Sequence, residues 1–273
     1  MVKINTSFWK NKKILLTGHT GFKGTWLLLW LLNLGADVWG YSKGYEDGSL
    51  FDLLLKERSI NLTSIRWKHF EGDVLDKEKL KNVVELCEPD IVIHMAAQAI
   101  VRSSYRNPIE TWETNVNGTL NLLEALKTIK RKCSCLVVTT DKVYENNGDL
   151  KSFKEDDKLG GIDPYSASKA AVEIAVSSWR NSFLDNANNL KLATARAGNV
   201  IGGGDNAVDR IVPDIVRSLL LKEKIHIRNP SSSRPWQHVL ECLNGYLILI
   251  ERLSIKDNKI FDCFNFGPKE KNS

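Results

Sequence analysis

The feature that most constrains the fold is a glycine-rich turn near the N-terminus, between an apolar run and a helical stretch. The run "KILLT" covers residues 13–17, and the apolar stretch 22–34 after it has the spacing of a buried helix. Gly18, Gly21 and Gly24 follow the run directly. Glycines at such a turn permit a tight bend, close approach of the backbone to a pyrophosphate and close packing of helix on strand. The pattern predicts a βαβ opening that binds a dinucleotide; a tight turn without a ligand is the alternative, because the spacing is G-x-x-G-x-x-G.

The same alternation of strand-like and helical segments continues along the chain. Further apolar runs lie in "ADVWGY", "IRWKHFEGD", "PDIVIHMAA", "SCLVVTTD" and "LKLATARAGNV", and a helix is predicted from about Tyr165 to Phe183. Apolar runs without polar alternation, separated by helices, are typical of a parallel sheet covered on both faces. We therefore expect an α/β fold, with a doubly wound parallel Rossmann-type sheet over residues 1–199.

The pattern changes after Asn199 and predicts a smaller region. "IGGGD" reads as a loop, "DRIVPDIVRSLLL" and "HVLECLNGYLILIERL" as helices, and "KIHIRN" as a short strand. We expect residues 200–273 to form a substrate-binding lobe, with some segments returning to the main domain. Because the sequence ends soon after the strand-like "FDCFNF", without further helices, we expect this lobe to be incomplete.

Charge and hydropathy argue against nucleic-acid and membrane partners. The 38 basic residues are interspersed with 33 acidic ones, and the densest basic cluster, at 127–132, closes a predicted helix, where cations are favoured. The longest apolar run, Trp26 to Gly35, is about half the roughly 20 residues that cross a bilayer. The N-terminus lacks the hydrophobic segment of a signal peptide. We expect a cytoplasmic protein.

The cysteines and histidines do not indicate a metal site. The five cysteines include no C-x-x-C pair, which favours free thiols, and the five histidines form no cluster with metal-ligand spacing. We expect no bound metal.

The residues after the second and third strand-like runs bear on the adenosine end of a dinucleotide. An acid usually follows the second strand, but here Ser42 and Lys43 stand there. Because Lys43 suits a 2′-phosphate, the residues alone leave NAD and NADP open. Asp73 in "GDVLD" is placed to bind the adenine edge, and capping the next helix is its alternative role.

A tyrosine and a lysine at helical spacing indicate proton chemistry. Tyr165 and Lys169 in "YSASK" lie one turn apart and share a helix face. The lysine would lower the pKa of the phenol by stabilising phenolate, which makes a base for a hydroxyl proton during hydride transfer. A surface pair is the alternative, but the pair and the glycine turn together favour a dinucleotide-dependent enzyme.

Six motifs in order resemble the extended short-chain dehydrogenase/reductase family: "TGHTGFKG", "GDVLD", "HMAAQ", "TNVNGT", "TTDKVY" and "YSASK". The resemblance covers essentially the whole chain and implies NAD as cofactor. It also implies that helices near 105–131 and 165–183 pack against a second subunit, in a homodimer or homotetramer. Asn115 as a helix cap and Thr140 as a strand residue are the alternatives to site roles. The motifs and the resemblance together predict these NAD-binding residues: Gly18, His19, Gly21, Phe22, Lys23, Gly24, Asp73, Val74, Ala96, Ala97, Gln98, Asn115, Tyr165 and Lys169.

The residues after Thr140 point to one branch of that family. Epimerases of the family generally have small residues there, and sugar-nucleotide 4,6-dehydratases have Asp then Glu, whereas this chain has Asp141 then Lys142. This Asp-Lys variant, with "RAGNVIGGGD" and "RPWQHVLE", resembles the dehydratases that act on CDP-glucose. The resemblance implies a lyase that makes CDP-4-dehydro-6-deoxy-D-glucose, for deoxysugars of surface polysaccharide such as lipopolysaccharide O-antigen.

The resemblance also implies a role for each residue of this group. Thr140 would bind the sugar hydroxyl, Tyr165 would take the proton from the C4 hydroxyl, and Asp141 would protonate the departing 6-hydroxyl, which requires a protonated carboxyl. Lys142 stands where most dehydratases place the base at C5. To act as a base it must be desolvated or crowded by a cation such as Lys169; a charged Lys142 that stabilises the enolate is the alternative.

The remaining expectations concern binding. Arg234 is predicted to hold the phosphates of the sugar nucleotide, since a planar guanidinium fits phosphate oxygens, and a solvated loop charge is its alternative. By resemblance Asn199 also lies near the diphosphate. Cations at Lys142 and His19 predict loose binding of NAD+. Two rival functions stay open, a 4-epimerase or reductase of the same fold and a non-catalytic NAD-binding protein whose incomplete lobe prevents turnover.

Overall fold

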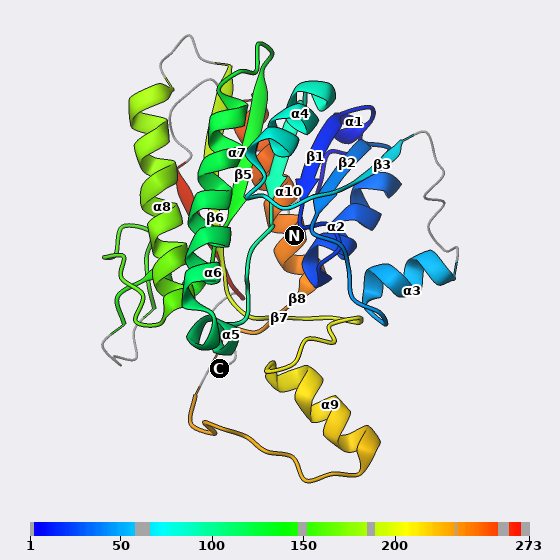
Figure 1. Cartoon of the computed structure of the whole chain (residues 1–273), viewed down its shortest axis with the longest axis vertical. Helices are drawn as coiled ribbons and strands as arrows, with labels where there is room; N and C mark the ends of the chain where they lie inside the picture. Colours follow the sequence, from blue (N-terminus) through cyan, green and yellow to red (C-terminus); the bar gives the residue numbers. More distant parts are fainter. Residues whose placement is uncertain are drawn as a thin grey trace.

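Seven parallel strands form one sheet in the computed structural model, which describes residues 3–57, 66–146, 152–184, 189–232, 234–255 and 262–268 (Figure 1). The strand order is β3-β2-β1-β4-β5-β6-β9, and every neighbouring pair is parallel. The order reverses between β1 and β4, so the sheet is doubly wound as predicted. The strands are β1 Lys13–Thr17, β2 Asp37–Ser42, β3 Trp67–Glu71, β4 Ile91–His94, β5 Cys133–Val138, β6 Leu190–Ala197 and β9 Cys263–Phe266.

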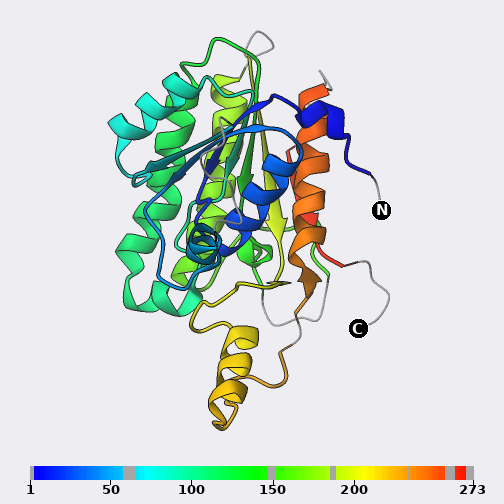
Figure 2. The ribbon, with the colours of Figure 1, turned by 90° about the vertical axis from the view of Figure 1, so that its right-hand side faces the viewer.

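Helices cover both faces of the sheet, as Figures 1 and 2 show. One face carries α1 (Thr6–Trp9), α2 (Phe22–Asn33) and α10 (Val239–Ile255), and the other carries α4 (Lys77–Cys87), α7 (Gly118–Leu126) and α8 (Pro164–Phe183). Because β4 and β5 are buried along their whole length, their sequences are apolar runs. The expected α/β class is confirmed.

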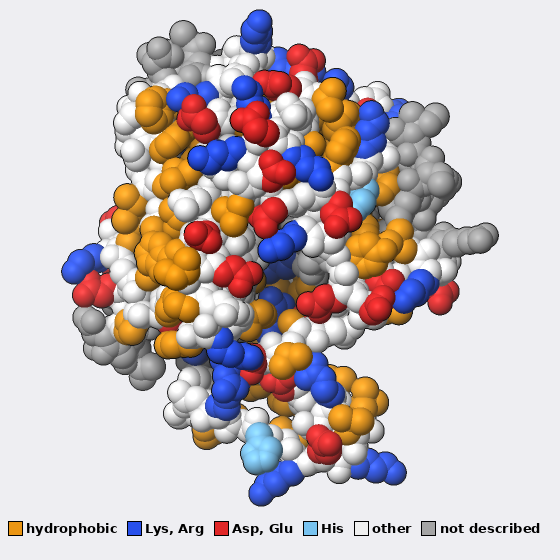
Figure 3. Space-filling model, viewed as in Figure 1, with side chains coloured by type: hydrophobic (Ala, Val, Ile, Leu, Met, Phe, Trp, Pro, Cys, Tyr) orange, Lys and Arg blue, Asp and Glu red, His pale blue; other side chains and the backbone are white. Residues whose placement is uncertain are grey.

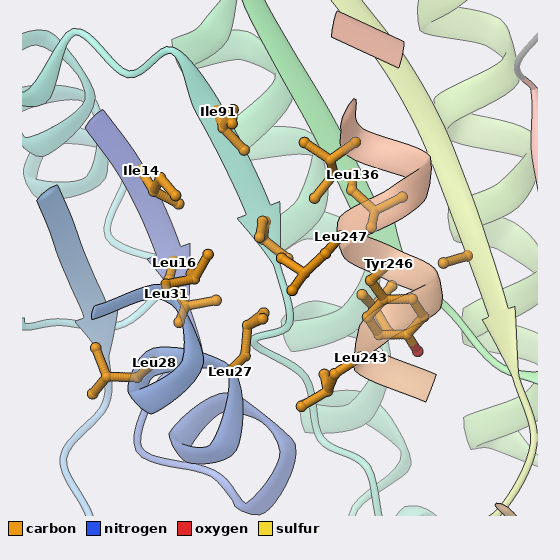
Figure 4. Packing of buried hydrophobic residues seen from close by; sticks show 14 of the residues in the cluster. Ile14, Leu16, Leu27, Leu28, Leu31, Ile91, Leu136, Leu243, Tyr246 and Leu247 are labelled. Carbon is orange, nitrogen blue, oxygen red and sulfur yellow. The ribbon is translucent and has the colours of Figure 1, made fainter. Parts of the chain in front are cut away.

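The larger core lies between the sheet, α2 and α10. In α2, Gly24, Leu27, Leu28 and Leu31 are buried, which is the i, i+3, i+4, i+7 pattern of one helix face. Figure 4 shows side chains from both helices and three strands packed together: Leu27, Leu28, Leu31, Leu243, Tyr246, Leu247, Ile14, Leu16, Ile91 and Leu136. This packing fixes the N-terminus of α2 against the end of β1, where the glycine turn lies.

The helix expected near 105–131 is present with shorter bounds: α6 (Pro108–Trp112), a π-helical turn (Glu113–Asn117) and α7 follow one another without a break. A separate short helix, α5 (Val101–Arg106), precedes them. Pro108 has no N–H to continue α5, and it occupies a first-turn position of α6, where that loss has no cost. Short π-helical turns inside helices are frequent at functional sites, and this one contains Asn115.

The region after Asn199 extends below the carboxyl ends of the strands (Figures 1 and 2). It contains β7 (Val200–Ile201), which pairs in parallel with β8 (Gln237–His238), and α9 (Ile211–Leu221). The strand predicted at "KIHIRN" is wrong: residues 224–229 are irregular and exposed, and they pair with no strand among the described residues. From there the chain returns to the main sheet as α10 and β9.

A helix that the sequence analysis did not predict is α3, Leu50–Lys56. The side chain of Ser49 caps it by accepting a hydrogen bond from the backbone N–H of Asp52 at 3.2 Å. Among the described residues, no helix combines the length and apolar character needed to span a bilayer.

Candidate active site

The predicted site residues gather at the carboxyl ends of the central strands, the edge where doubly wound sheets hold ligands. β1 ends before the glycine turn, β4 before residues 95–98, and β5 before residues 139–142. The segment that carries β7, α9 and β8 lies across the same edge. Figure 3 shows a hollow between this segment and the main body, with basic side chains in it.

The glycine turn leaves room for a pyrophosphate at the start of α2. Gly18 has φ = 73°, and a Cβ on it would lie 2.7 Å from the backbone nitrogen of Ala96. A Cβ on Gly24 would overlap the carbonyl oxygen of Gly18. Gly21 is the N-cap of α2, and no side chain caps this helix, so its first N–H groups are available to an anion. The turn therefore fits the diphosphate of a dinucleotide.

Lys43 and Asp73, at the predicted adenosine end, form an ion pair of 3.2 Å. Asp73 also accepts a hydrogen bond from the backbone N–H of Leu75 at 3.0 Å, whereas the cap of α4 is Asp76. Asp73 therefore does not have the alternative helix-capping role. Because the Lys43 amine already contacts a carboxylate, it is less suited to bind a 2′-phosphate.

His19 is not the cation that was expected beside the cofactor. Its ring is fully buried against Phe51 and Trp67, and its Nε2 lies 2.8 Å from Nδ1 of His69. Burial, with repulsion from His69, lowers the pKa of His19 to about 3. The ring is therefore neutral at physiological pH, so His19 does not supply the expected cation, and loose binding of NAD+ stays a prediction that rests on Lys142.

Asn115 holds the segment after β4 in place. Its Oδ1 accepts from the backbone N–H of Gln98 at 2.9 Å, and its Nδ2 donates to Ser168 of α8 at 2.9 Å and to the carbonyl oxygen of Gln98 at 3.2 Å. Gln98 in turn donates from Nε2 to Thr111 at 2.9 Å. Asn115 is buried inside the π-helical turn and caps no helix. It thus fixes the backbone near Ala96 and Ala97 against α8.

Val74 and Phe22, two other predicted NAD-binding residues, mainly pack. Val74 is buried, and its side chain would collide with a Cβ on Gly118. Phe22 packs against the larger core.

A buried relay under the glycine turn was missed by the sequence analysis. Thr17 Oγ1 accepts from the backbone N–H groups of Met95 and Ala96, so it donates its own proton to Nδ1 of His94 at 2.7 Å. His94 Nε2 lies 3.1 Å from Thr119. Burial, with the charge of Lys169, lowers the pKa of His94 to about 3. The relay ties the ends of β1 and β4 to α7, and no spacing pattern marks it because its residues are far apart in sequence.

Tyr165 and Lys169 lie at the start of α8, as predicted. Asp163 caps this helix by accepting from the backbone N–H of Ser166 at 2.9 Å, and Pro164 occupies the first turn. Both site residues are buried, at 8% and 5% exposure. The local sequence "DPYSASK" therefore sets where the helix begins and which of its faces meets the sheet.

Burial dominates the electrostatics of this pair. It raises the pKa of Tyr165 to about 12, against the opposing effect of a side-chain hydrogen bond with Thr140. It lowers the pKa of Lys169 to about 8, while the carboxylate of Glu173 acts in the opposite direction. Lys169 donates to the carbonyl oxygen of Val138 at 3.1 Å. The amine is thus held at the end of β5, close to the tyrosine it would assist.

Thr140, Asp141 and Lys142 form a tight turn directly after β5. Thr140 lies outside the strand and caps a 3-10 turn, Asp141–Val143, by accepting from the backbone N–H of Lys142 at 3.4 Å. Lys142 Nζ and Asp141 Oδ1 are 3.5 Å apart, with side chains 32% and 29% exposed. Thr140 donates to the same carboxylate oxygen at 3.1 Å. The turn places a carboxyl, an amine and a hydroxyl beside Tyr165.

The second region contributes residues to the same edge. A Cβ on Gly198 would lie 2.7 Å from Pro235 and 3.4 Å from the carboxylate of Asp141, so the loop before β8 packs beside the catalytic turn. Arg234 precedes that proline and is exposed. Asn199 has a buried side-chain oxygen without a partner among the described residues. Such a polar atom in a cleft fits contact with a polar ligand.

Arg210 and Lys23 complete the charged lining. Arg210 pairs with Asp205 at 3.0 Å and lies close enough to Tyr165 to lower its pKa, although burial outweighs this effect. The charge of Lys23 contributes to lowering the pKa of Lys169, after burial, and Nζ of Lys23 lies 5.9 Å from the ring centre of Tyr246. Arg210 was not predicted, because a lone arginine before a helix has no distinctive spacing.

Comparison with known sequences matches the chain to sugar-nucleotide dehydratases. The profile of the GDP-mannose 4,6-dehydratase family matches residues 15–262. The CDP-glucose 4,6-dehydratase of Salmonella typhimurium is 45% identical over 99% of this chain and 75% of its own length. The dTDP-D-glucose 4,6-dehydratase of Dictyostelium discoideum is 30% identical over 94% of this chain and 58% of its own length.

Solved structures agree in fold at lower identity. An epimerase from Methanothermobacter thermautotrophicus superposes with a TM-score of 0.79 at 22% identity, covering 96% of this chain and 73% of the other. A dTDP-glucose 4,6-dehydratase from Streptomyces venezuelae, determined with NAD bound, has a TM-score of 0.78 at 23% identity, covering 93% and 75%. These likenesses establish the architecture on which the site is built.

Proposed function

Because the chain belongs to the GDP-mannose 4,6-dehydratase family, we propose that it is an NAD-dependent lyase that converts CDP-D-glucose to CDP-4-dehydro-6-deoxy-D-glucose. Family membership confirms the resemblance that the six motifs indicated. One observation carries the substrate: the 45% identity, over nearly the whole chain, to a CDP-glucose 4,6-dehydratase. The product would supply deoxysugar biosynthesis for surface polysaccharide.

The turn after β5 supports dehydration over epimerisation. An epimerase needs a base only at the hydroxyl that it oxidises, whereas loss of water across C5 and C6 also needs an acid and a group that acts on the C5 proton. Asp141 and Lys142 supply an acid and an amine 3.5 Å apart beside Tyr165. This pair is the local feature that favours the dehydratase over the rival epimerase.

NAD fits the described residues better than NADP. The open N-terminus of α2 would hold the diphosphate, and Asp73 at the end of β3 would face the adenosine. Lys43, the residue that would favour a 2′-phosphate, is paired with Asp73. When bound, NAD supplies the hydride acceptor for C4 and the hydride that returns to C6, so it is regenerated in each cycle.

The residues of the chain would divide the proton transfers among them. Tyr165 takes the proton of the C4 hydroxyl, and Thr140 orients that hydroxyl. The charge of Lys169 stabilises the phenolate, which a buried tyrosine with a pKa of about 12 needs at neutral pH. Asp141 gives a proton to the departing 6-hydroxyl, and Lys142 removes the proton from C5.

The contact between Asp141 and Lys142 links their two roles. A carboxylate beside an ammonium stabilises both charges, yet the proposed chemistry needs a protonated Asp141 and a neutral Lys142. Transfer of one proton from Lys142 Nζ to Asp141 Oδ1 produces both forms at once, with no change in total charge. Desolvation by a bound sugar would favour this neutral pair, because burial disfavours separated charges.

The sugar nucleotide would lie between the main sheet and the segment after residue 199. Arg234 would bind its phosphates, and Asn199 would contact the diphosphate from the end of β6. We keep the division into an NAD-binding part, 1–199, and a substrate lobe, 200–273, as a proposal.

A homodimer or homotetramer through α5, α6 and α8 is part of the same proposal. Apolar side chains stand exposed on the outer side of these helices, and Figure 3 shows orange side chains gathered over α6 and α8. The exposed residues are Tyr105, Ile109, Trp112, Ile174 and Phe183. Monomeric proteins rarely leave such a contiguous patch uncovered.

We propose the cytoplasm as the location, where sugar nucleotides and NAD are both present.

The decisive experiment is incubation with NAD+ and CDP-glucose, dTDP-glucose or GDP-mannose in parallel, with detection of a 4-keto product. We expect turnover of CDP-glucose and none by the Tyr165→Phe variant. Turnover of only the dTDP sugar would overturn the substrate and leave the reaction class. Formation of a C4 epimer without a 4-keto sugar would favour the rival epimerase, and NAD+ binding without any product would favour the non-catalytic rival.

A further inference from the structure

A buried ion pair lies directly beneath the catalytic turn. Glu173 of α8 and Arg196 of β6 are 2.9 Å apart, with side chains 3% and 4% exposed. Burying two charged side chains costs more free energy than burying two apolar side chains of the same volume, unless hydrogen bonds satisfy the polar atoms of the ion pair. The location of the pair, one layer below the site, suggests what its hydrogen bonds are for.

The Glu173 carboxylate holds the residue that precedes Thr140. Its Oε1 accepts a hydrogen bond from the hydroxyl of Thr139, and its Oε2 accepts from Thr194 at 2.7 Å and from Arg196. The backbone N–H of Thr139 also donates to the carbonyl oxygen of Ala195 at 2.8 Å. Thr139 is therefore fixed at both side chain and backbone, where β5 passes into the catalytic turn.

Arg196 holds the other end of the same turn. It donates to the hydroxyl of Tyr144 at 2.9 Å, and its guanidinium lies 5.1 Å from the ring centre. Tyr144 donates to Asn265 of β9 at 2.6 Å and stacks on Phe153 with ring centres 4.8 Å apart. The ion pair thus grips Thr139 through one partner and Tyr144 through the other. The residues between them are 140–143.

Glu173 also faces the catalytic amine. It lies four residues after Lys169 on the same side of α8, and its negative charge favours the protonated form of that amine. Other ionisable groups interact electrostatically with Lys169, Glu173 or Arg196. They are Lys23, His94, Tyr144, Glu155 and Cys263.

We propose that Glu173 and Arg196 are positioning residues for the dehydratase reaction: together they clamp the turn between Thr139 and Tyr144, and the Glu173 carboxylate, one helical turn after Lys169, places a negative charge on the side of α8 that carries the amine. This inference rests on the proposed function. Neither residue touches the substrate, and each acts through Thr139, Tyr144 or Lys169. Asp141 and Lys142, which would act on the sugar, are about one third exposed, whereas the pair that holds their turn is buried.

Two isosteric variants separate positioning from packing. Thr139→Val and Thr194→Val each remove one hydroxyl that bonds to Glu173, but only Thr139 adjoins the catalytic turn. We expect Thr139→Val to lower kcat about tenfold, with KM and the Kd of NAD+ nearly unchanged, because small misplacements of catalytic groups are costly. Thr194→Val should keep the kcat of the wild type. Equal losses of kcat in the two variants would overturn the clamp.

The charge is tested by Glu173→Gln and the pH dependence of kcat. Removing a negative charge lowers the pKa of every neighbouring group, so both limbs of the profile should move to lower pH, by about one unit. Thr194→Val is the control and should not shift the profile. An unshifted profile in folded Glu173→Gln would refute the charge role; if this variant does not fold, the two threonine variants decide the positioning role.

Failure of the proposed function would look different from failure of this inference. If the wild type makes no 4-keto sugar, the function is wrong; the pKa of Lys169 can then be measured by NMR with isotope-labelled lysine, using Lys169→Met for assignment. A Lys169 pKa that is lower in Glu173→Gln than in the wild type would support the charge role without turnover, and an equal pKa would refute it. If the wild type is active and Thr139→Val matches it, only the clamp fails.

Discussion

Two ion pairs near the end of β5 differ in almost every physical respect. Asp141 and Lys142 are adjacent in sequence, 3.5 Å apart and about one third exposed. Glu173 and Arg196 come from α8 and β6, are 2.9 Å apart and are nearly inaccessible to water. A partly exposed pair can reorient around a ligand, whereas a buried pair held by several hydrogen bonds keeps one geometry, although Nε of Arg196 has no partner among the described residues. The exposed pair, Asp141 and Lys142, is suited to proton transfer with a substrate, and the buried pair, Glu173 and Arg196, is suited to fixing the position of the catalytic turn.

The largest expected effect is on the buried pair. Arg196→Met leaves the carboxylate of Glu173 without its ionic partner, and loss of one partner of a buried pair costs about 3–5 kcal/mol of unfolding free energy. Urea denaturation followed by circular dichroism measures this cost. The matched change in the exposed pair, Lys142→Met, should cost no more than about 1 kcal/mol. Similar losses of unfolding free energy in the two variants would show that the buried pair is no more important for stability than the exposed pair.

The next effect is on chemistry, and here the exposed pair should dominate. Lys142→Ala removes the proposed base, so exchange of the C5 proton with solvent should fall at least about a hundredfold, as loss of a general base does. Mass spectrometry of the sugar after incubation in deuterated water follows this exchange. Exchange at the wild-type rate would mean that Lys142 is not the base.

A smaller effect is expected where the second region meets the substrate. Arg234→Ala should raise KM for the sugar nucleotide about tenfold or more, since a hydrogen bond to a charged group contributes about 1.5–3 kcal/mol. Steady-state kinetics with varied sugar nucleotide gives KM and kcat separately. An unchanged KM would assign Arg234 its alternative role, a solvated loop charge.

The smallest effect concerns the exposed pair at the adenosine end. Lys43→Met removes the ion pair between Lys43 and Asp73. Because the side chain of Lys43 is 71% exposed, the unfolding free energy should change by less than about 1 kcal/mol. The preference for NAD+ over NADP+, measured as the ratio of the two Kd values, should persist. A variant that loses all preference would place Lys43 at the ribose.

Local sequence features predicted the elements that the site needs. The glycine turn, the strand ends and the Tyr165–Lys169 spacing were predictable because each depends on neighbours within one or two helical turns. Predictions failed where an element needs a distant partner. The run at 224–229 has strand-like alternation but pairs with no strand in the described part of the chain, and Pro108 sets a later start for the helix that the resemblance implied near 105–131.

The sequence by itself determined the first six strands of the sheet, the backbone freedom at Gly18 and the shared face of Tyr165 and Lys169. Only the tertiary structure decided which charged groups lose contact with water. Phe51, Trp67 and His69 surround His19, and this burial lowers its pKa, while strands remote in sequence bury Glu173 with Arg196. Burial is a property of what surrounds a group, and the surroundings here come from distant parts of the chain, so no local pattern contains them.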